Sequence, residues 1–249
     1  MTSERVCSPE ELVGHSVSDV ISFLPTFRWH IDRESRQYDV KIGRLVFVSY
    51  DTWKPRIQPD LYHSLEVVPG CAVPEQRLVS VITPRKGRTI GVTSLVCLDG
   101  DNFDKKNGIG RGSWAHLPLI DMDLDADLSR TEALQLIKRE LRKTGVGNGL
   151  ILCSGKENHY HFIGTERLLT EDQLPTFVGL CLFMFDQNKK VLIDPRWAGH
   201  TLTPMKYLTE MGRAPGLTNY DLTIRFATLR VSINEKKLQI PEVVDIFDY

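Results

Sequence analysis

Hydrophobic and acidic residues alternate strictly along Leu117–Asp127, which reads LPLIDMDLDAD. A period of two is the strand period, so the pattern predicts a strand with a buried apolar face and a row of acids on the other face: Asp121, Asp123 and Asp125. Like charges at this spacing repel one another, and a fold that keeps them usually supplies a counter-charge. The usual counter-charge for such a cluster is Mg²⁺ or Mn²⁺, because these ions prefer carboxylate oxygens as ligands. The alternative is a strand that ends in a solvated acidic turn, with Asp125 already in the loop.

Residues 1–112 are typical of an N-terminal extension rich in strands. The first 30 residues predict a tail with one short helix around Pro9–Leu24. Asp99–Gly112 is polar and glycine-rich and predicts a loop. Between them, three β-branched or apolar runs separated by Pro, Gly and charged turns predict strands at Arg44–Tyr50, Arg77–Thr83 and Thr89–Leu98.

The order of elements after the acidic strand predicts the fold class. Ser129 and Glu132 form a capping box for a helix with apolar residues at helical spacing, which Gly145 ends. The segments that follow predict two strands, a helix and a last strand, at Gly149–Ser154, His159–Thr165, Glu171–Phe185 and Lys190–Ile193. This order is a split βαβ layout, RRM-like or ferredoxin-like, so we expect an α+β fold for a core at residues 113–240. The acidic strand would be central, with His159 and His161 beside it on the acidic face.

The C-terminal part adds an isolated acid and a basic strand. Asp194 follows the last strand of the layout, in the sequence IDPRWAGHTL. Leu222–Ser232 (LTIRFATLRVS) predicts a strand that carries basic residues. Pro241–Tyr249 is acidic and apolar, which fits either a docking peptide or a packed end.

Composition narrows the class of protein. With 41% hydrophobic and 25% charged residues, the chain of 249 residues is typical of a globular protein, and we find no apolar run of transmembrane length and no signal peptide. Five scattered cysteines without a C-x-x-C pair predict reduced thiols in a cytoplasm, not a disulfide framework or a zinc ribbon. The net charge of −1 excludes a protein that coats DNA through bulk charge.

Four short motifs stand in an order that resembles a known superfamily. They are the D-h-D end of the acidic strand (h, hydrophobic), the hairpin SGKENHYH at Ser154–His161, the isolated Asp194, and the later sequence L-R-x-S. Together, over about Trp114–Lys237, they resemble the archaeo-eukaryotic primase superfamily in its bacterial and phage branch. The resemblance implies a metal-dependent nucleotidyltransferase, a primase-polymerase that makes or extends primers from NTPs or dNTPs on a single-stranded DNA or RNA template.

The resemblance also assigns residues to roles. Nucleotidyl transfer requires an ionised 3′-hydroxyl and a stabilised pyrophosphate, and two metal ions held by three carboxylates supply both. Asp121, Asp123 and Asp194 would be these catalytic ligands of Mg²⁺ or Mn²⁺. Hydrogen-bond donors and positive charge suit the triphosphate oxygens, and the candidates for that role are Ser154, Lys156, His161, His200, Arg225 and Arg230. A helicase or another replication or defence protein would be the protein partner, and no membrane contact is expected.

Two other functions stay open on the sequence alone. A catalytically inactive module with the primase fold would bind nucleic acid or a partner protein without metal. A metal-dependent phosphoesterase or nuclease would use the same acids, but it would release phosphate or cut strands without extending a chain.

Overall fold

The computed structural model describes residues 7–33, 36–51, 61–99, 113–155, 158–203, 225–233 and 238–249. Its helical segments are η1 (Pro9–Leu12), α1 (Val17–Phe23), η2 (Leu24–Thr26), α2 (Glu75–Ile82), α3 (Arg130–Leu141), η4 (Arg142–Thr144), α4 (Gln173–Cys181) and α5 (Pro195–Leu202). Its strands are β1 (Trp29–Arg33), β2 (Arg36–Asp51), β3 (Leu61–Glu66), β4 (Arg88–Asp99), β5 (Trp114–His116), β6 (Leu119–Asp123), β7 (Gly149–Cys153), β8 (His159–Gly164), β9 (Arg167–Leu168), β10 (Thr228–Arg230) and β11 (Glu242–Phe247).

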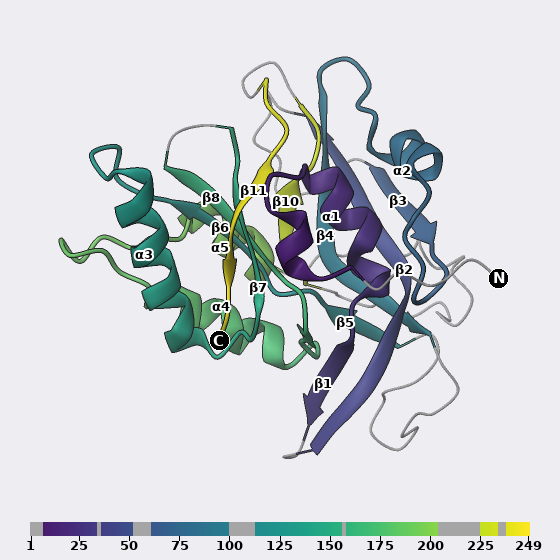
Figure 1. Ribbon diagram of the computed structural model, residues 1–249, viewed down its shortest axis with the longest axis horizontal. Helices are drawn as coiled ribbons and strands as arrows, with labels where there is room; N and C mark the ends of the chain where they lie inside the picture. The colour runs from purple at the N-terminus through teal and green to yellow at the C-terminus, as the bar shows by residue number, and fades with distance from the viewer. Residues whose placement is uncertain are drawn as a thin grey trace.

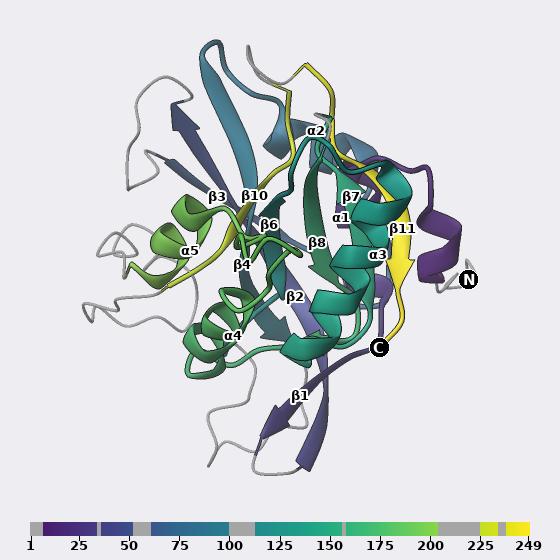
Figure 2. The ribbon, with the colours of Figure 1, turned by 90° about the vertical axis from the view of Figure 1, so that its left-hand side faces the viewer.

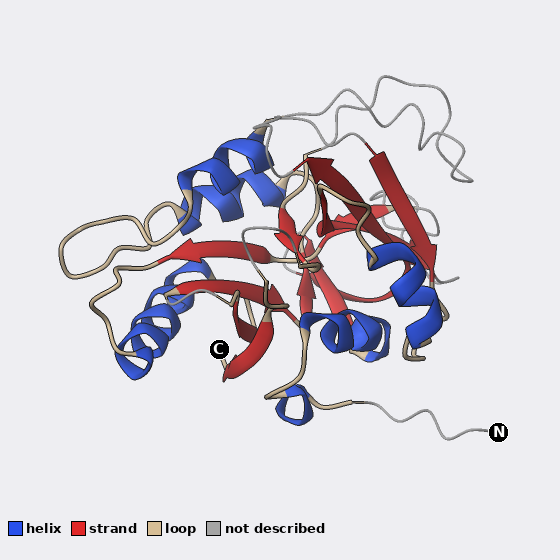
Figure 3. Cartoon of the chain, turned by 90° about the horizontal axis from the view of Figure 1, so that it is seen from above, coloured by secondary structure: helices blue, strands red, loops and turns tan. Residues whose placement is uncertain are grey.

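The described strands form two sheets. One has seven strands in the order β10-β4-β2-β1-β9, with β3 paired to β2 and β5 paired to β4. The other has four strands in the order β11-β7-β8-β6. Figure 1 shows the smaller sheet with α3 and α4 on the left and the long strands β2 and β4 on the right. Seen from above, helices lie on both sides of the strands (Figure 3). The predicted α+β class is confirmed.

The four-stranded sheet has the connectivity expected of a split βαβ fold. Segment 191–193 extends it beyond β6 through an antiparallel bridge between Met122 and Ile193. The spatial order is then segment 191–193, β6, β8 and β7, with β11 added at the far edge. This is the ferredoxin-like order, and the acidic strand β6 is central in it, as the sequence predicted. The strand expected at 190–193 is present only as isolated bridges.

Helix α3 follows the signals read from the sequence. The N–H of Glu132 donates to Oγ of Ser129 (3.3 Å), and the N–H of Ser129 donates to the carboxylate of Glu132 (3.0 Å), which completes the capping box. Gly145 ends the helical run with a left-handed φ of 64°. α3 packs an apolar face into the core through Ala133, Ile137 and Leu141. Figure 2 shows α3 in front of β7 and β8.

Three sequence expectations need correction. The run at 77–83 is not a strand but most of α2, because Leu78, Val81 and Ile82 recur at helical spacing and turn one face inward. The single helix expected at 9–24 is divided into η1 and α1, since Gly14 adopts a left-handed φ of 85° and Ser16 starts a new capping box. In the described residues of 222–232, only Thr228–Arg230 is strand, and it pairs with β4, not with the acidic strand.

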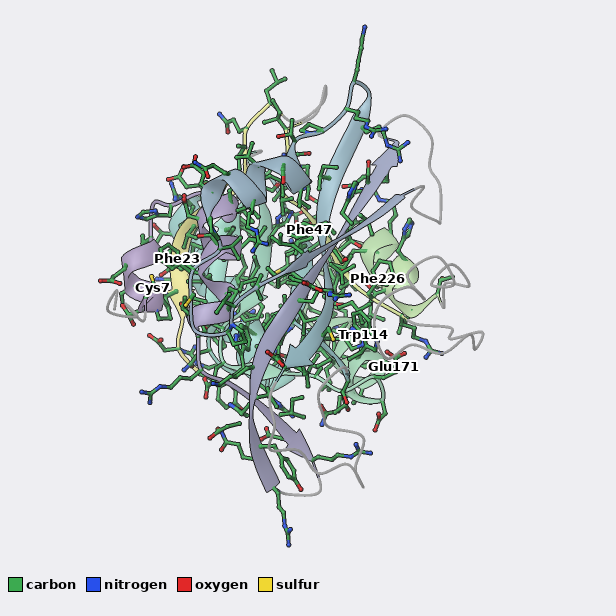
Figure 4. All side chains as sticks on the ribbon, turned by 90° about the vertical axis from the view of Figure 1, so that its right-hand side faces the viewer. Cys7, Phe23, Phe47, Trp114, Glu171 and Phe226 are labelled. Atoms are coloured by element: carbon green, nitrogen blue, oxygen red, sulfur yellow. The ribbon has the colours of Figure 1, made fainter. Side chains whose placement is uncertain are left out.

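The two faces of the β2–β4 sheet bury different clusters. Alternate residues of a strand point to opposite faces, so Phe47 joins the large core while Val46 and Val48 join a small second cluster with Phe226. In Figure 4, Phe226 and Trp114 lie on the opposite side from Phe23 and Cys7. Tyr50 packs against the second cluster. The face that carries this second cluster therefore also carries Tyr50.

The large hydrophobic cluster runs through most of the described chain, from Cys7 to Phe247. It includes residues on both sides of position 112, where the sequence predicted the end of an N-terminal extension, and that division stays a prediction. None of the described helices combines the length and the apolar character needed to cross a membrane.

The C-terminal segment is a packed end, which decides between the two interpretations left by the sequence. β11 pairs antiparallel with β7 at the edge of the smaller sheet. The Phe247 side chain is fully buried, and its ring lies 6.1 Å from that of Phe162 in an edge-on arrangement.

We predict that Phe247→Ala lowers the free energy of unfolding by about 3–5 kcal/mol, because it leaves a cavity between β11 and the core. The matched control is Tyr249→Ala, whose ring is 67% exposed and should contribute less than about 1 kcal/mol. Urea unfolding followed by circular dichroism measures both. Equal effects of the two changes would contradict the packed end.

Candidate functional site

The acidic strand and the hairpin bring two Asp–His pairs together. The register of β6 and β8 places Asp121 opposite His161 and Asp123 opposite His159. Nε2 of His161 lies 3.5 Å from Oδ1 of Asp121, and Nε2 of His159 lies 3.4 Å from Oδ1 of Asp123. The His161 side chain is only 2% exposed, whereas the Asp123 side chain is 49% exposed. The two Asp–His pairs therefore have a buried end at His161 and an open end at Asp123.

Asp194 joins this row from the other side of β6. Its N–H donates to the carbonyl of Asp121 (3.0 Å), and the N–H of Asp123 donates to the carbonyl of Leu192 (2.8 Å). In an antiparallel pair, residues directly opposite each other share a face. Because Met122 and Ile193 point into the core, Asp121 and Asp194 point to the same outer face. His161, Asp121 and Asp194 thus form one line across three backbone segments. We call this line, together with the neighbouring pair Asp123 and His159, the Asp121 row.

Asp194 caps helix α5 and binds the guanidinium of Arg196. Its Oδ1 accepts from the N–H of Arg196 (2.8 Å), and its Oδ2 accepts from an Arg196 terminal nitrogen, also at 2.8 Å. Burial acts against the charged form of Asp194, but the hydrogen bonds from Arg196 outweigh it and lower the pKa of this carboxyl. Asp194 contributes most to the raised pKa of Arg196, with smaller contributions from Asp121 and Asp123. All three acids therefore act on one guanidinium.

The acids offer suitable donors for a metal ion, although in this structure one of them binds an arginine and two lie beside histidines. Within the described part of the chain, no group of three or more His, Cys, Asp or Glu side chains is arranged to hold a metal ion. The acids instead lie beside His161, His159 and Arg196. Carboxylate oxygens from two adjoining backbone segments are the donor chemistry that Mg²⁺ and Mn²⁺ prefer.

Arg230 ties the hairpin turn to the C-terminal segments. Its terminal nitrogens donate to the carbonyls of Ser154 (2.6 Å), Ser232 (2.6 Å) and Gln239 (2.9 Å). Burial lowers the pKa of Arg230, while Tyr50 and Asp121 act in the opposite direction. Nε of Arg230 and Oγ of Ser154 are buried polar atoms without a hydrogen-bond partner among the described residues. Two unsatisfied donors are thus buried near the acids, in the part of the site where the sequence predicted triphosphate contacts.

Tyr50 is a part of this site that the sequence did not predict. It comes from β2, in the larger sheet, and lies close enough to Asp121 and Arg230 for both to affect its titration. Burial is the main cause that raises the pKa of Tyr50 to about 12. Its hydroxyl is therefore protonated at neutral pH and cannot serve as a base there. No motif near position 50 pointed to this role.

The turn of the hairpin depends on two special backbone positions. Gly155 has φ 80°, and a Cβ there would lie 2.6 Å from Cβ of Gln239. Asn158 has φ 59°, and its side-chain amide donates to the carbonyl of Asp125 (2.7 Å). The turn thereby holds the end of the acidic strand. Lys156, predicted to bind nucleotide, lies outside the described residues.

The remaining predicted residues lie around this centre. Asp125 is beyond the end of β6 and is paired with Lys190, which supports the loop interpretation. His200 is exposed on α5, one turn after Arg196. Arg225 donates to the carbonyl of Leu202 (3.3 Å) and lies 3.6 Å from the carboxylate of Glu171. Arg225 is therefore directed to the end of α5 and the start of α4.

The part of the sequence that forms this arrangement is similar to one known protein family. Residues 109–206 match the AEP-like family, described as archaeo-eukaryotic primase 1D-like. This segment is similar to archaeo-eukaryotic primase domains. No curated protein and no solved structure matches the chain. The primase-like segment contains β6, the hairpin and Asp194, whereas Tyr50 and Arg230 lie outside it.

We predict that Arg230→Lys lowers the free energy of unfolding by about 2–3 kcal/mol, because a single ammonium nitrogen cannot replace two terminal nitrogens that bond the Ser154 carbonyl on one side and the Ser232 and Gln239 carbonyls on the other. Arg225→Lys is the matched control, since this side chain is 36% exposed and its loss should be below about 1 kcal/mol. Guanidinium unfolding curves for the two variants give the comparison. The structural role assigned to Arg230 is wrong if its variant is no less stable than the Arg225 variant.

Proposed function

We propose that the chain is a metal-dependent nucleotidyltransferase of the primase-polymerase type. The observation that carries the proposal is the pairing of Asp121 with Asp194 across β6 and segment 191–193, inside the segment that matches primase-like proteins. Acids from two remote parts of the sequence share one face, beside the hairpin at Ser154–His161. If the acidic stretch were only a solvated turn at the end of a strand, segment 191–193 would not need to bring Asp194 beside it.

Asp121, Asp123 and Asp194 are the proposed ligands of Mg²⁺ or Mn²⁺. When bound, these ions supply the charge that ionises a 3′-hydroxyl and stabilises a departing pyrophosphate. His161, at 3.5 Å from Asp121 and almost fully buried, orients that carboxylate. His159 has the same relation to Asp123 at the open end of the row. In the proposal, each histidine orients the carboxylate beside it. His161 is the better suited of the two to this role, because its side chain is buried.

The proposed nucleotide contacts surround the Asp121 row. Ser154 and Arg230 each contribute a buried donor atom without a partner among the described residues. The positive charge of Arg230 favours a triphosphate near Asp121, while its terminal nitrogens secure the turn. His200 adds a donor on α5, and Arg225 and Lys156 complete the proposed set. Tyr50 contributes a neutral hydroxyl to the same region.

The proposed substrates are NTPs or dNTPs, with single-stranded DNA or RNA as the template. A helicase or another replication or defence protein is the proposed partner, and the cytoplasm is the proposed location. Because the net charge is −1, template binding depends on local basic groups and falls as salt concentration rises.

A catalytically inactive primase-fold module is the second candidate. The observation that favours it is that the acids already have partners within the protein: the guanidinium of Arg196 binds Asp194, and the imidazoles of His161 and His159 lie beside Asp121 and Asp123. Such a module would bind nucleic acid equally with and without divalent ions. Changes to its acids would leave that binding unaltered.

We expect Asp121→Ala and Asp123→Ala each to reduce nucleotide incorporation at least about 100-fold, since each removes a ligand oxygen pair from the metal site. Primer-extension and de novo synthesis assays with labelled nucleotides and Mg²⁺ or Mn²⁺ measure this. Asp127→Ala is the matched control, because Asp127 is exposed in the turn after β6 and should keep the wild-type rate.

The same assays separate the alternatives. Incorporation at the wild-type rate by both acidic variants would exclude the proposed site. Cut strands or released phosphate without chain extension would identify a phosphoesterase or nuclease. Metal-independent binding that is insensitive to both changes would identify the inactive module.

A further inference from the structure

The most exposed member of the acidic site is a cation, Arg196. Its side chain is 83% exposed, while that of its partner Asp194 is 16% exposed. We propose that Arg196 is an exchangeable counter-charge: it neutralises Asp194 before ligands bind, yields Asp194 to a divalent ion, and then binds the triphosphate. This inference rests on the proposed function and adds a residue to it that no motif assigned.

The geometry of the pair suits a competitor for a metal ligand. The guanidinium contacts both carboxylate oxygens of Asp194, with Nε at 3.1 Å and 3.2 Å and a terminal nitrogen at 2.8 Å. A divalent ion on Asp194 needs the same oxygens and would be repelled by a positive charge at that distance. The two cations therefore bind Asp194 in turn.

The electrostatic reach of Arg196 extends over the whole row. Asp194, which Arg196 binds, lies directly opposite Asp121 in the pairing of β6 with segment 191–193, and Asp123 is two residues further along β6. Three carboxylates on one face without any cation would repel one another, so Arg196 stabilises the row in its unliganded form. Once divalent ions supply that charge, the guanidinium is no longer required by the acids. It is then available for another anion at the same site.

Helix α5 can release Arg196 without moving. Trp197, Ala198 and Thr201 bury the inner face of the helix, at 6%, 3% and 1% exposure. The N–H of Arg196 stays bonded to Asp194, so the cap persists when the side chain turns away. Arg196 and His200 are four residues apart and lie on the same exposed face. That face presents two donors beside the row.

A triphosphate is the anion that fits the released side chain. The planar fork of arginine binds phosphate oxygens bidentately, as it binds the carboxylate here. The anion must lie next to the acids, because the side chain remains anchored at the second residue of α5. A triphosphate accompanied by divalent ions meets both conditions, whereas a free carboxylate would be repelled by the acidic row.

The first test measures Mn²⁺ affinity without nucleotide, from the signal of free Mn²⁺ in electron paramagnetic resonance. Arg196→Ala should bind Mn²⁺ about 5–10-fold more tightly than the wild type, because the competitor is gone. Arg196→Lys, which keeps the charge and loses the fork, should lie between them. Arg77→Ala, an exposed arginine change on α2, should match the wild type.

The second test measures binding of the Mn²⁺ complex of inorganic tripolyphosphate by calorimetry at saturating Mn²⁺. Arg196→Ala should weaken this binding about 10-fold, and Arg77→Ala should leave it unchanged. The probe lacks base and sugar, so the result reports the phosphate contact alone. Thermal unfolding of each variant confirms that the fold is intact.

The outcomes separate this inference from the proposed function. If the wild type binds Mn²⁺ in a way that Asp121→Ala abolishes, but Arg196→Ala changes neither affinity, then the exchange is wrong and the metal site stands. If the wild type binds no Mn²⁺, both fail together. Tighter Mn²⁺ binding combined with weaker tripolyphosphate binding supports the exchange.

Discussion

The structure depends on the antiparallel pairing of β6 with segment 191–193. Met122 and Ile193, one from each partner of this pairing, enter the core on the same face, and strand alternation then forces Asp121 and Asp194 onto the other face. The two backbone hydrogen bonds at 2.8 Å and 3.0 Å fix the register. A shift of one residue would bury the acids and expose the apolar pair. Hydrophobic burial on one face therefore positions charge on the other.

The larger sheet completes the site that the primase-like segment begins. β10 belongs to that sheet through its pairing with β4, yet Arg230 reaches across to the carbonyl of Ser154 in the hairpin turn. Tyr50 approaches the same region from β2. Hydrogen bonds compensate the cost of burying a cation, and the terminal nitrogens of Arg230 bond carbonyls in three segments. The region outside the family match thus contributes side chains to the proposed site and does not only support it.

Local signals in the sequence predicted the smaller sheet well. The alternation around Asp121, the capping box at Ser129 and the hairpin at Ser154–His161 act over a few residues, so their consequences can be read directly. The helix α2 was missed because Val79, Val81 and Ile82 favour strands by type, while the burial of Leu78 on a helical face depends on a partner the sequence does not reveal. Tyr50 and Arg196 were missed for a related reason. Their positions become meaningful only when remote segments meet, and only Arg196 had a nearby signal, the Asp-Pro-Arg sequence at the start of α5.

Two arginines beside the same acids differ in what their surroundings allow. Arg230 is 6% exposed and has both terminal nitrogens bonded to carbonyls, so its charge is permanent and its position is fixed. Arg196 is 83% exposed and has a carboxylate as its side-chain partner, so its charge can leave at little cost in desolvation. A site that receives divalent ions and a polyanion needs both kinds of cation. In the proposed exchange, Arg230 is the fixed cation, and Arg196 is the one that compensates the acids until divalent ions bind. The acidic row therefore never has to exist as three uncompensated charges, which explains how a strand can carry it in a stable fold.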